Sequence, residues 1–142
     1  MTEVTFHFNV PAKLEYACRL LRKAHASGAT VGVLGPDELL RTLDTALWSF
    51  SALDFVPHCL ASAPEPVRRA TPIVLATDCA ELPQAGVLLN LGDAVPAGFE
   101  RFERLIELVD TSDADRAQAR PRWRHYTDRG YPIERHDLAA RE

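Results

Sequence analysis

The first fifty residues alternate between two hydrophobic periods, and this alternation limits the possible folds more than any other feature. Residues 4–10 (VTFHFNV) place apolar side chains at every second position, which is the period of a β-strand. Residues 11–27 change to helical spacing and end at Gly28, a residue suited to the backbone that terminates helices. An apolar strand at 30–34 and a helix at 37–50 follow. This order predicts a parallel α/β sheet flanked by helices.

The remainder of the chain continues with shorter elements. We expect a short extended segment at 55–58, a loop at 61–71, and strands at 73–76 and 87–91. A third helix is predicted over residues 98–109, and a fourth begins at Ser112, which with Asp115 fits a capping box. Pro121 should kink or restart the fourth helix, because proline removes one backbone hydrogen bond. Residues 130–133 (GYPI) are typical of a turn into an edge segment.

Length and composition are those of one small domain with its own core. The chain has 142 residues, of which 46% are hydrophobic and 25% charged, so we expect a single domain over residues 1–142. Cys18, Cys59 and Cys79 are scattered and odd in number, which favours a reducing compartment over a disulfide framework. No export signal and no run of ~18 apolar residues is present, so we expect a cytoplasmic protein without membrane contact.

The usual signatures of cofactor sites and catalysis are missing. Gly28, Gly32 and Gly35 lack the spacing of a dinucleotide fingerprint or a phosphate loop, and we interpret them as structural. His58 and Cys59 are adjacent rather than spaced as metal ligands on one helix face. No serine lies in a G-x-S-x-G elbow. We therefore predict no catalytic residue, no cofactor and no metal.

Positive charge gathers at the end of the chain. The formal net charge is −4, yet residues 116–142 carry seven basic and four acidic side chains. Within this segment Arg116, Arg120, Trp123 and Arg124 recur at i, i+4, i+7 and i+8, so they line one helix face. Arginine forms paired hydrogen bonds with carboxylates and phosphates, and tryptophan adds an apolar wall. The stripe favours a short anionic peptide or a phosphate group.

A second candidate surface lies on the helix predicted at 37–50. Trp48 shares a face with Arg41 and Asp44, opposite the leucines that should point inward. Phe55 follows seven residues later. An exposed aromatic pair is a candidate interface hot spot, because such residues dominate binding energies. The alternative, that Trp48 folds over the loop onto Phe55 as a satellite of the core, stays open.

Several segments together carry a family resemblance that covers essentially the whole chain. They are residues 43–48 (LDTALW), 55–58 (FVPH) and 87–93 (VLLNLGD), and the terminal run R-x-x-x-R-x-R-W-R-x-Y-x-x-x-G-Y. In order and spacing they resemble the chi subunit of bacterial DNA polymerase III. The resemblance implies a Rossmann-like three-layer sandwich with a mostly parallel central sheet and no nucleotide-binding loop. It also implies a non-catalytic accessory protein of the clamp-loader complex, involved in DNA replication.

The same resemblance implies two protein partners. Chi proteins join the assembly through the psi subunit, and they bind the acidic C-terminal tail of the single-stranded DNA-binding protein, which ends in a phenylalanine with a free carboxylate. The residues implied to bind the tail are Val109, Arg116, Arg120, Trp123 and Arg124. Trp48 and Phe55 are implied to contact psi or another protein partner. Contact with DNA would then be indirect.

Two other function classes remain open from the residues alone. The chain could be a small nucleotide-dependent α/β enzyme that uses the carboxyl edge of its sheet, where ligands of such folds usually bind. It could also bind single-stranded DNA directly through the arginine-rich helix, although one helix end is a short track for a strand. We rank both below the peptide-binding hypothesis.

Overall fold

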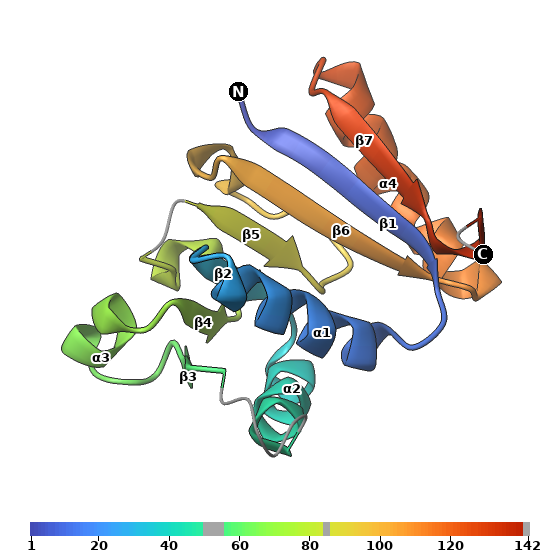
Figure 1. Cartoon of the computed structure of the whole chain (residues 1–142). Coiled ribbons are helices and arrows are strands. Elements are labelled where there is room, and N and C mark those ends of the chain that lie inside the picture. Colours follow the sequence, from blue (N-terminus) through green and yellow to red (C-terminus); the bar gives the residue numbers. More distant parts are fainter. Residues whose placement is uncertain (50–55, 84–85, 141–142) are drawn as a thin grey trace.

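The computed structural model describes residues 1–49, 56–83 and 86–140, and places seven strands in one entirely parallel sheet (Figure 1). The strands are β1 (Glu3–Val10), β2 (Val31–Leu34), β3 (His58–Leu60), β4 (Ile73–Ala76), β5 (Val87–Asn90), β6 (Arg104–Asp110) and β7 (Ile133–Asp137). The helices are α1 (Lys13–Ala26), α2 (Asp37–Ser49), α3 (Glu65–Ala70) and α4 (Asp113–Asp128), with short 3₁₀ turns η1 (Cys79–Glu81), η2 (Phe99–Arg101) and η3 (Leu138–Ala140). The predicted α/β class is confirmed.

Helices lie on both faces of the sheet, which makes three layers. In Figure 1, α1 and α2 lie in front of the sheet and α4 lies behind β1 and β7. The front core gathers Leu21 of α1 and Leu43 of α2 against strand residues, all fully buried. The rear core gathers Phe99, Phe102 and Tyr126. Because both faces are covered, central strands such as β4 are buried at every position, and the sequence there is a continuous apolar run.

The strand order is β3-β4-β2-β5-β6-β1-β7, so the first strand of the chain lies between two strands from its last third. In β1, Val4 pairs with Leu105 of β6 on one side and with Ile133 of β7 on the other. The strand at the β1 end of the sheet is therefore β7, which confirms the edge segment expected after residues 130–133. Among the described residues, no helix is both long and apolar enough to span a bilayer.

The helix predicted over residues 98–109 is wrong. This segment holds the turn η2 and then strand β6, which is a central strand of the sheet. Its apolar residues fit helical spacing, but Leu105 and Val109 face the rear core while Ile106 and Leu108 face the front core. A strand buried on both faces has no alternation of apolar and polar residues to distinguish it from a helix.

Two smaller predictions need correction around residues 55–71. The expected loop at 61–71 contains the short helix α3, which begins after Pro64. Its Pro66 lies in the first turn, where a missing N–H costs no helical hydrogen bond. The strand β3 is His58–Leu60, later than the extended segment expected at 55–58. Phe55, a predicted site residue, lies outside the described residues.

The capping box predicted for the fourth helix is confirmed in its first half. Ser112 is the N-cap of α4, and its hydroxyl accepts a hydrogen bond of 3.1 Å from the backbone N–H of Asp115. The expected restart at Pro121 is absent, because α4 runs as one helix through this residue. Pro121 and Ala117, whose carbonyl would have accepted the missing bond, are both exposed, so water can satisfy that carbonyl.

We predict that Ser112→Ala lowers the free energy of unfolding by about 1 kcal/mol, because the N–H of Asp115 loses its cap. Urea denaturation at neutral pH measures this change. Ser62→Ala is the matched control, since Ser62 is an exposed serine outside the helices and strands. Equal unfolding midpoints for the two variants would contradict the capping role.

Candidate functional site

A groove of about 340 Å³ lies between α4 and the rear face of the sheet. Strands β1, β6 and β7 supply its floor and one wall, and α4 supplies the other. Its lining residues are Phe6, Phe8, Val109, Arg116, Ala119, Arg120, Trp123 and Arg135. The groove thus brings together four of the five residues predicted for peptide binding, from β6 and from two turns of α4.

The floor of the groove is apolar because of the strand period. Phe6 and Phe8 point to the same side of β1, and Val109 joins them from β6. Ala119 is the buried residue of α4 that faces them, and its small side chain leaves room for the groove. The half-buried Trp123 closes one end, with its ring 5.0 Å from that of Phe6 at 63°. This edge-to-face packing fixes the orientation of the indole.

Three arginines surround this apolar floor. Arg116 donates a 2.7 Å hydrogen bond to the side chain of Asn9, and its other terminal nitrogen is 3.7 Å from Asp113. The guanidinium of Arg135 lies 5.7 Å above the ring of Trp123, at cation–π distance. Among the described residues, Arg120 makes no hydrogen bond or ion pair, so its donors are available to a ligand. An apolar floor with a cationic rim suits a ligand that combines an apolar group with a carboxylate.

The structure adds one residue, Arg135, to those predicted for peptide binding, and it places one predicted residue, Arg124, outside the groove. Arg135 comes from β7 and was missed, because its proximity to α4 depends on the pairing of β7 with β1. One signal could have found it. Arg135 lies two residues after the apolar Ile133 in the expected edge segment, so in a strand both side chains point to the same face of the sheet. Arg124 is exposed on α4 but is not among the residues that line the groove.

Behind the groove, a buried ion pair holds α4 against the sheet. Glu107 in the middle of β6 is fully buried, and its carboxylate lies 3.1 Å from Nε of Arg122, which is 3% exposed. Tyr126 and Asn90 donate to the same carboxylate at 2.6 Å and 3.0 Å. Arg122 also donates to the carbonyl of Asp93 at 3.0 Å. Each charged group is therefore paired and hydrogen-bonded, as burial requires.

Burial shifts the acid–base behaviour of this cluster. It raises the pKa of the Glu107 carboxyl, while the charge of Arg122 and the hydrogen bonds from Tyr126 and Asn90 act in the opposite direction. The pKa of Tyr126 is also raised, first by burial and then by the neighbouring Glu107. Tyr126 therefore stays protonated, as a hydrogen-bond donor to Glu107, at pH values where an exposed tyrosine would ionise.

Trp48 forms a separate exposed surface on α2. Its side chain is 60% exposed, and its ring lies 5.1 Å from that of His58. The buried His58 is held by the carbonyl of Val56 at 2.7 Å from Nδ1. Its Nε2 lies 3.0 Å from Asp44, without the alignment of a hydrogen bond. Trp48 is therefore exposed and packs against the ring of His58, whose position is fixed. Phe55, which was expected to contact Trp48, lies outside the described residues.

The carboxyl edge of β2, β4 and β5 is where a fold of this kind would bind a nucleotide. A crevice of about 510 Å³ lies there, and its charged lining residues are Asp37, Asp78 and Asp93. No lysine or arginine is among its described lining residues. Three carboxylates repel phosphate groups, so this crevice does not favour the nucleotide-dependent enzyme. Within the described residues, no group of three His, Cys, Asp or Glu side chains is placed to hold a metal ion.

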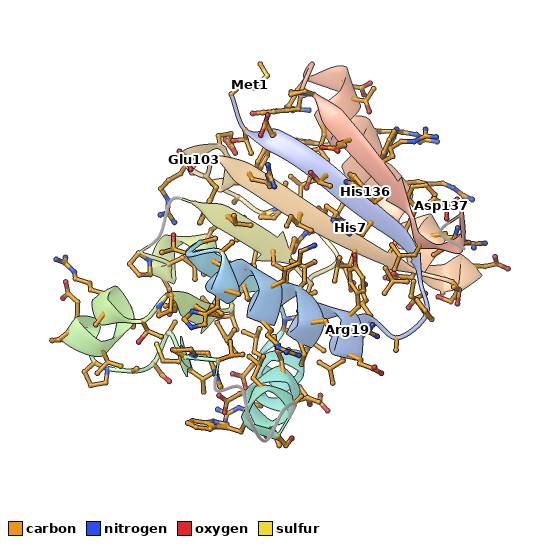
Figure 2. The ribbon with its side chains drawn as sticks, viewed as in Figure 1. Met1, His7, Arg19, Glu103, His136 and Asp137 are labelled. Carbon is orange, nitrogen blue, oxygen red and sulfur yellow. The ribbon has the colours of Figure 1, made fainter. Side chains whose placement is uncertain are left out.

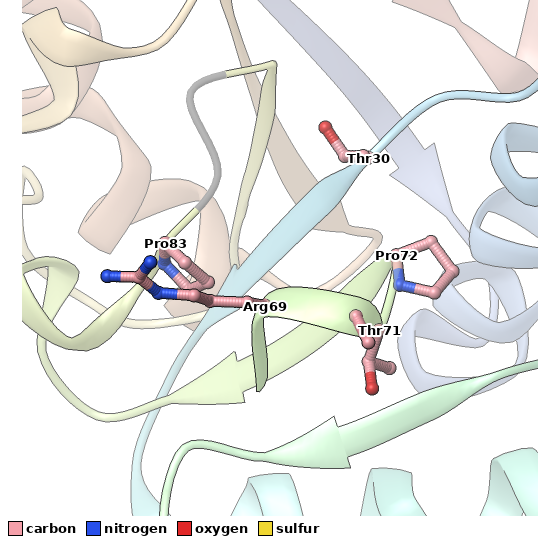
Figure 3. A pocket seen from close by; sticks show the side chains of 6 residues that line it. Thr30, Arg69, Thr71, Pro72 and Pro83 are labelled. Atoms are coloured by element: carbon pink, nitrogen blue, oxygen red, sulfur yellow. The ribbon is translucent and has the colours of Figure 1, made fainter. Parts of the chain in front are cut away.

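A further pocket of about 510 Å³ lies at the amino ends of β2 and β4 (Figure 3). Thr30, Thr71, Pro72 and Pro83 line it with Ala70 and Arg69. The cation among them, Arg69, is already paired with Glu65 at 2.7 Å on α3. Among its described lining residues no charge is left unpaired, so the groove beside α4, with its cationic rim, is the better candidate site.

Comparison with known proteins agrees with the resemblance found in the motifs. A family model described as DNA polymerase III chi subunit, HolC, matches residues 1–134. A Pseudomonas aeruginosa protein named DNA polymerase III subunit chi is 35% identical over 143 residues, which covers 97% of this chain and 98% of that protein. A Haemophilus influenzae protein of the same name is 29% identical over 121 residues, covering 84% of this chain and 83% of that protein.

We predict that Arg122→Met lowers the free energy of unfolding by about 3 kcal/mol or more at pH 7, because it leaves the buried Glu107 charge unpaired. The loss should shrink at low pH. Without Arg122 the raised pKa of Glu107 rises further, so the unfolded chain ionises first as the pH increases, and the variant loses stability relative to the wild type as the pH rises above the ordinary glutamate pKa of about 4.

Chemical denaturation at several pH values measures both effects. Arg124→Met is the matched control, because Arg124 is an exposed arginine of the same helix. The control should change stability by less than about 0.5 kcal/mol at every pH. A loss in Arg122→Met that is small, or independent of pH, would contradict the role of the ion pair.

Proposed function

The chain belongs to the chi subunit family of DNA polymerase III, and from this membership we propose that it is a single-domain, non-catalytic accessory subunit of the clamp-loader complex. In this role it links the replication machinery to the single-stranded DNA-binding protein by binding that protein's acidic C-terminal tail. Bacterial replication takes place in the cytoplasm, which is the compartment we propose for this chain. The chain needs no cofactor for this role.

The groove beside α4 is the observation that supports tail binding most strongly. Its apolar floor, formed by Phe6, Val109 and Trp123, matches in character a terminal phenylalanine side chain. The guanidinium of Arg120, which has no partner among the described residues, then meets the free carboxylate, where paired charged hydrogen bonds are strongest. Arg116, held by Asn9, attracts acidic residues that precede the phenylalanine.

Arg124 contributes from outside the groove. It is exposed on α4 one residue after Trp123, so it reaches acidic residues of the peptide that do not enter the groove. Exposed charge pairs contribute less than buried ones, and we assign Arg124 the smaller effect. A short peptide held by these contacts binds with about micromolar affinity, or about −8 kcal/mol. Many tails on coated DNA compensate for this modest affinity by raising the effective concentration.

We predict that Trp123→Ala and Arg120→Ala each weaken binding of an acidic peptide ending in phenylalanine by about tenfold or more. Isothermal titration calorimetry measures the affinity, and amidation of the peptide's carboxylate should reproduce the loss caused by Arg120→Ala. Arg129→Ala is the control, since Arg129 is an exposed arginine at the end of α4 that does not line the groove. An unchanged affinity in the Trp123→Ala, Arg120→Ala double variant would refute the site.

The same experiment separates tail binding from direct binding of single-stranded DNA. Direct binding predicts that an oligonucleotide alone binds the protein and that its affinity falls steeply with salt. The peptide hypothesis predicts no measurable binding of the oligonucleotide unless the single-stranded DNA-binding protein with its tail is present. Stabilisation by a nucleotide in a thermal-shift assay, with none by the peptide, would instead favour an enzyme.

We also propose that Trp48 contacts the psi subunit or another protein partner, together with Phe55. A tryptophan that is 60% exposed and rests on a buried histidine ring is typical of an interface anchor. It lies on α2, on the opposite side of the sheet from the groove, so this contact and tail binding use separate surfaces.

We predict that Trp48→Ala weakens psi binding by about 30-fold or more without changing peptide affinity, because interface tryptophans often contribute 2 kcal/mol or more. Co-purification with psi and calorimetry with the peptide measure the two effects. Thr42→Ala is the control, since Thr42 is an exposed residue of the same helix on a different face from Trp48. Retention of full psi binding by Trp48→Ala would overturn this assignment.

A further inference from the structure

Strand β7 ends the sheet, and it also forms part of the groove. It pairs with β1 on one side, and no described strand pairs with its other side. We propose that this free edge is a second part of the peptide site: residues of the acidic peptide upstream of its carboxylate add to β7 as an extra strand. The inference rests on the proposed function and extends it, because it assigns a binding mode and a sequence preference to the peptide.

The backbone register shows which groups the edge offers. The N–H of Val4 donates to the carbonyl of Pro132 at 3.1 Å, and Val4 pairs with Ile133. In a parallel ladder the residues of one strand direct their backbone groups alternately to its two sides. Pro132 and Glu134 therefore face β1, whereas Ile133 and Arg135 direct their N–H and carbonyl groups toward the free edge. Pro132 at the start of β7 fits, since proline is confined to edges and strand starts.

The edge is continuous with the groove through one residue. The backbone of Arg135 lies on the free edge, while its side chain reaches the groove and stacks above Trp123. If the last residue of a peptide lies on the groove floor and the preceding residues pass out of the groove over Arg135, those residues run alongside β7. Main-chain hydrogen bonds to a sheet edge hold an extended peptide whatever its side chains, which suits a segment rich in acidic residues.

The two faces of β7 differ in charge, so the peptide should prefer acidic residues at every second position. Arg135 points to the rear face, toward α4. Glu134 and His136 point to the front face, where Glu134 lies 3.3 Å from His136 and the ring of His136 stacks on that of His7 at 4.9 Å. Figure 2 shows His7 and His136 side by side on β1 and β7, facing away from α4. Acidic peptide residues on the rear face meet Arg135, and those on the front face meet Glu134.

Charge on the edge also explains why such a strand can stay open. An exposed edge invites pairing with other chains, and charged side chains are a common protection against it. Ile133 is half-buried against the rear core, so the exposed side chains of β7 include the charged residues Glu134 and Arg135. These charges disfavour an apolar strand or a second copy of β7 and still admit a peptide that places acids opposite Arg135.

The first test leaves the protein unchanged. An acidic peptide ending in phenylalanine is methylated at one backbone nitrogen at a time, and each version is titrated into the full chain by calorimetry. We expect methylation to weaken binding by about tenfold at alternate upstream positions, where the N–H donates to β7, and to be tolerated at the positions between them. Replacing single acids by serine should show the same alternation, with the larger loss at rear-face positions.

The second test alters the edge of the protein. Arg135→Pro removes the N–H that faces the free edge and leaves the groups paired with β1 in place, whereas Arg135→Ala removes the side chain alone. We expect Arg135→Pro to bind the peptide about tenfold more weakly than Arg135→Ala does. Thermal unfolding checks that both variants remain folded, and amide exchange of Ile133 and Arg135 in the wild type should slow when the peptide is added.

The outcomes separate this inference from the function on which it rests. If the peptide binds and depends on Trp123 and Arg120, but every methylated version binds equally, the edge inference is overturned and tail binding stands. The same conclusion follows if Ile133 and Arg135 amides exchange at unchanged rates in the complex. If the unmodified peptide does not bind, both proposals fail together.

Discussion

The buried ion pair between Glu107 and Arg122 determines where the functional surface lies. Helix α4 is strongly polar, and of its buried residues Ala119, Arg122 and Tyr126 only Ala119 has no polar side-chain group. Arg122 and Tyr126 both bind the carboxylate in the middle of β6, which fixes the helix in place together with the packing of Tyr126 and Trp123 on Phe6. Because Trp123 follows Arg122 directly, the same anchor brings the indole to the edge of the helix that faces Phe6. The buried Glu107–Arg122 pair thus helps to position the helix that forms one wall of the apolar groove.

This dependence also explains which parts of the molecule could be predicted from the sequence. Two of the arginines that line the groove, Arg116 and Arg120, recur at helical spacing with Trp123, and a solvent-facing stripe of this kind is visible without coordinates. Arg122 lies in the same stretch, between Arg120 and Trp123, but points inward, and nothing in its spacing identifies its partner. Glu107 lies in the segment that was predicted as a helix over residues 98–109, so its position in the middle of a central strand was not predicted either. The partners of Glu107, which are Asn90 and Arg122, come from β5 and α4, and only the folded arrangement brings them to β6.

Residues from distant parts of the chain were the hardest to assign. Strand periods at the start of the chain and in residues 73–76 were read correctly, because they depend only on local alternation and burial. Arg135 reaches the groove because β7 pairs with β1, which is more than a hundred residues away in the sequence. The overall charge of −4 likewise gave little sign of a cationic rim. Folding concentrates three arginines around one groove, while the acids of the carboxyl edge lie elsewhere.

The place of β1 between β6 and β7 has a consequence for how the protein is made. Strand β1 is synthesised before both of its neighbours, so its β6 side stays unpaired until residues 104–110 have emerged and its β7 side until residues 133–137 have emerged. The strands β2 to β5 can pair before that time, because they are neighbours made from residues 31–90. Contacts that join the two ends of a chain form slowly, since the loop between them must close first. Loss of the last strand during synthesis would therefore leave the N-terminal strand with one free edge and the groove without its outer wall.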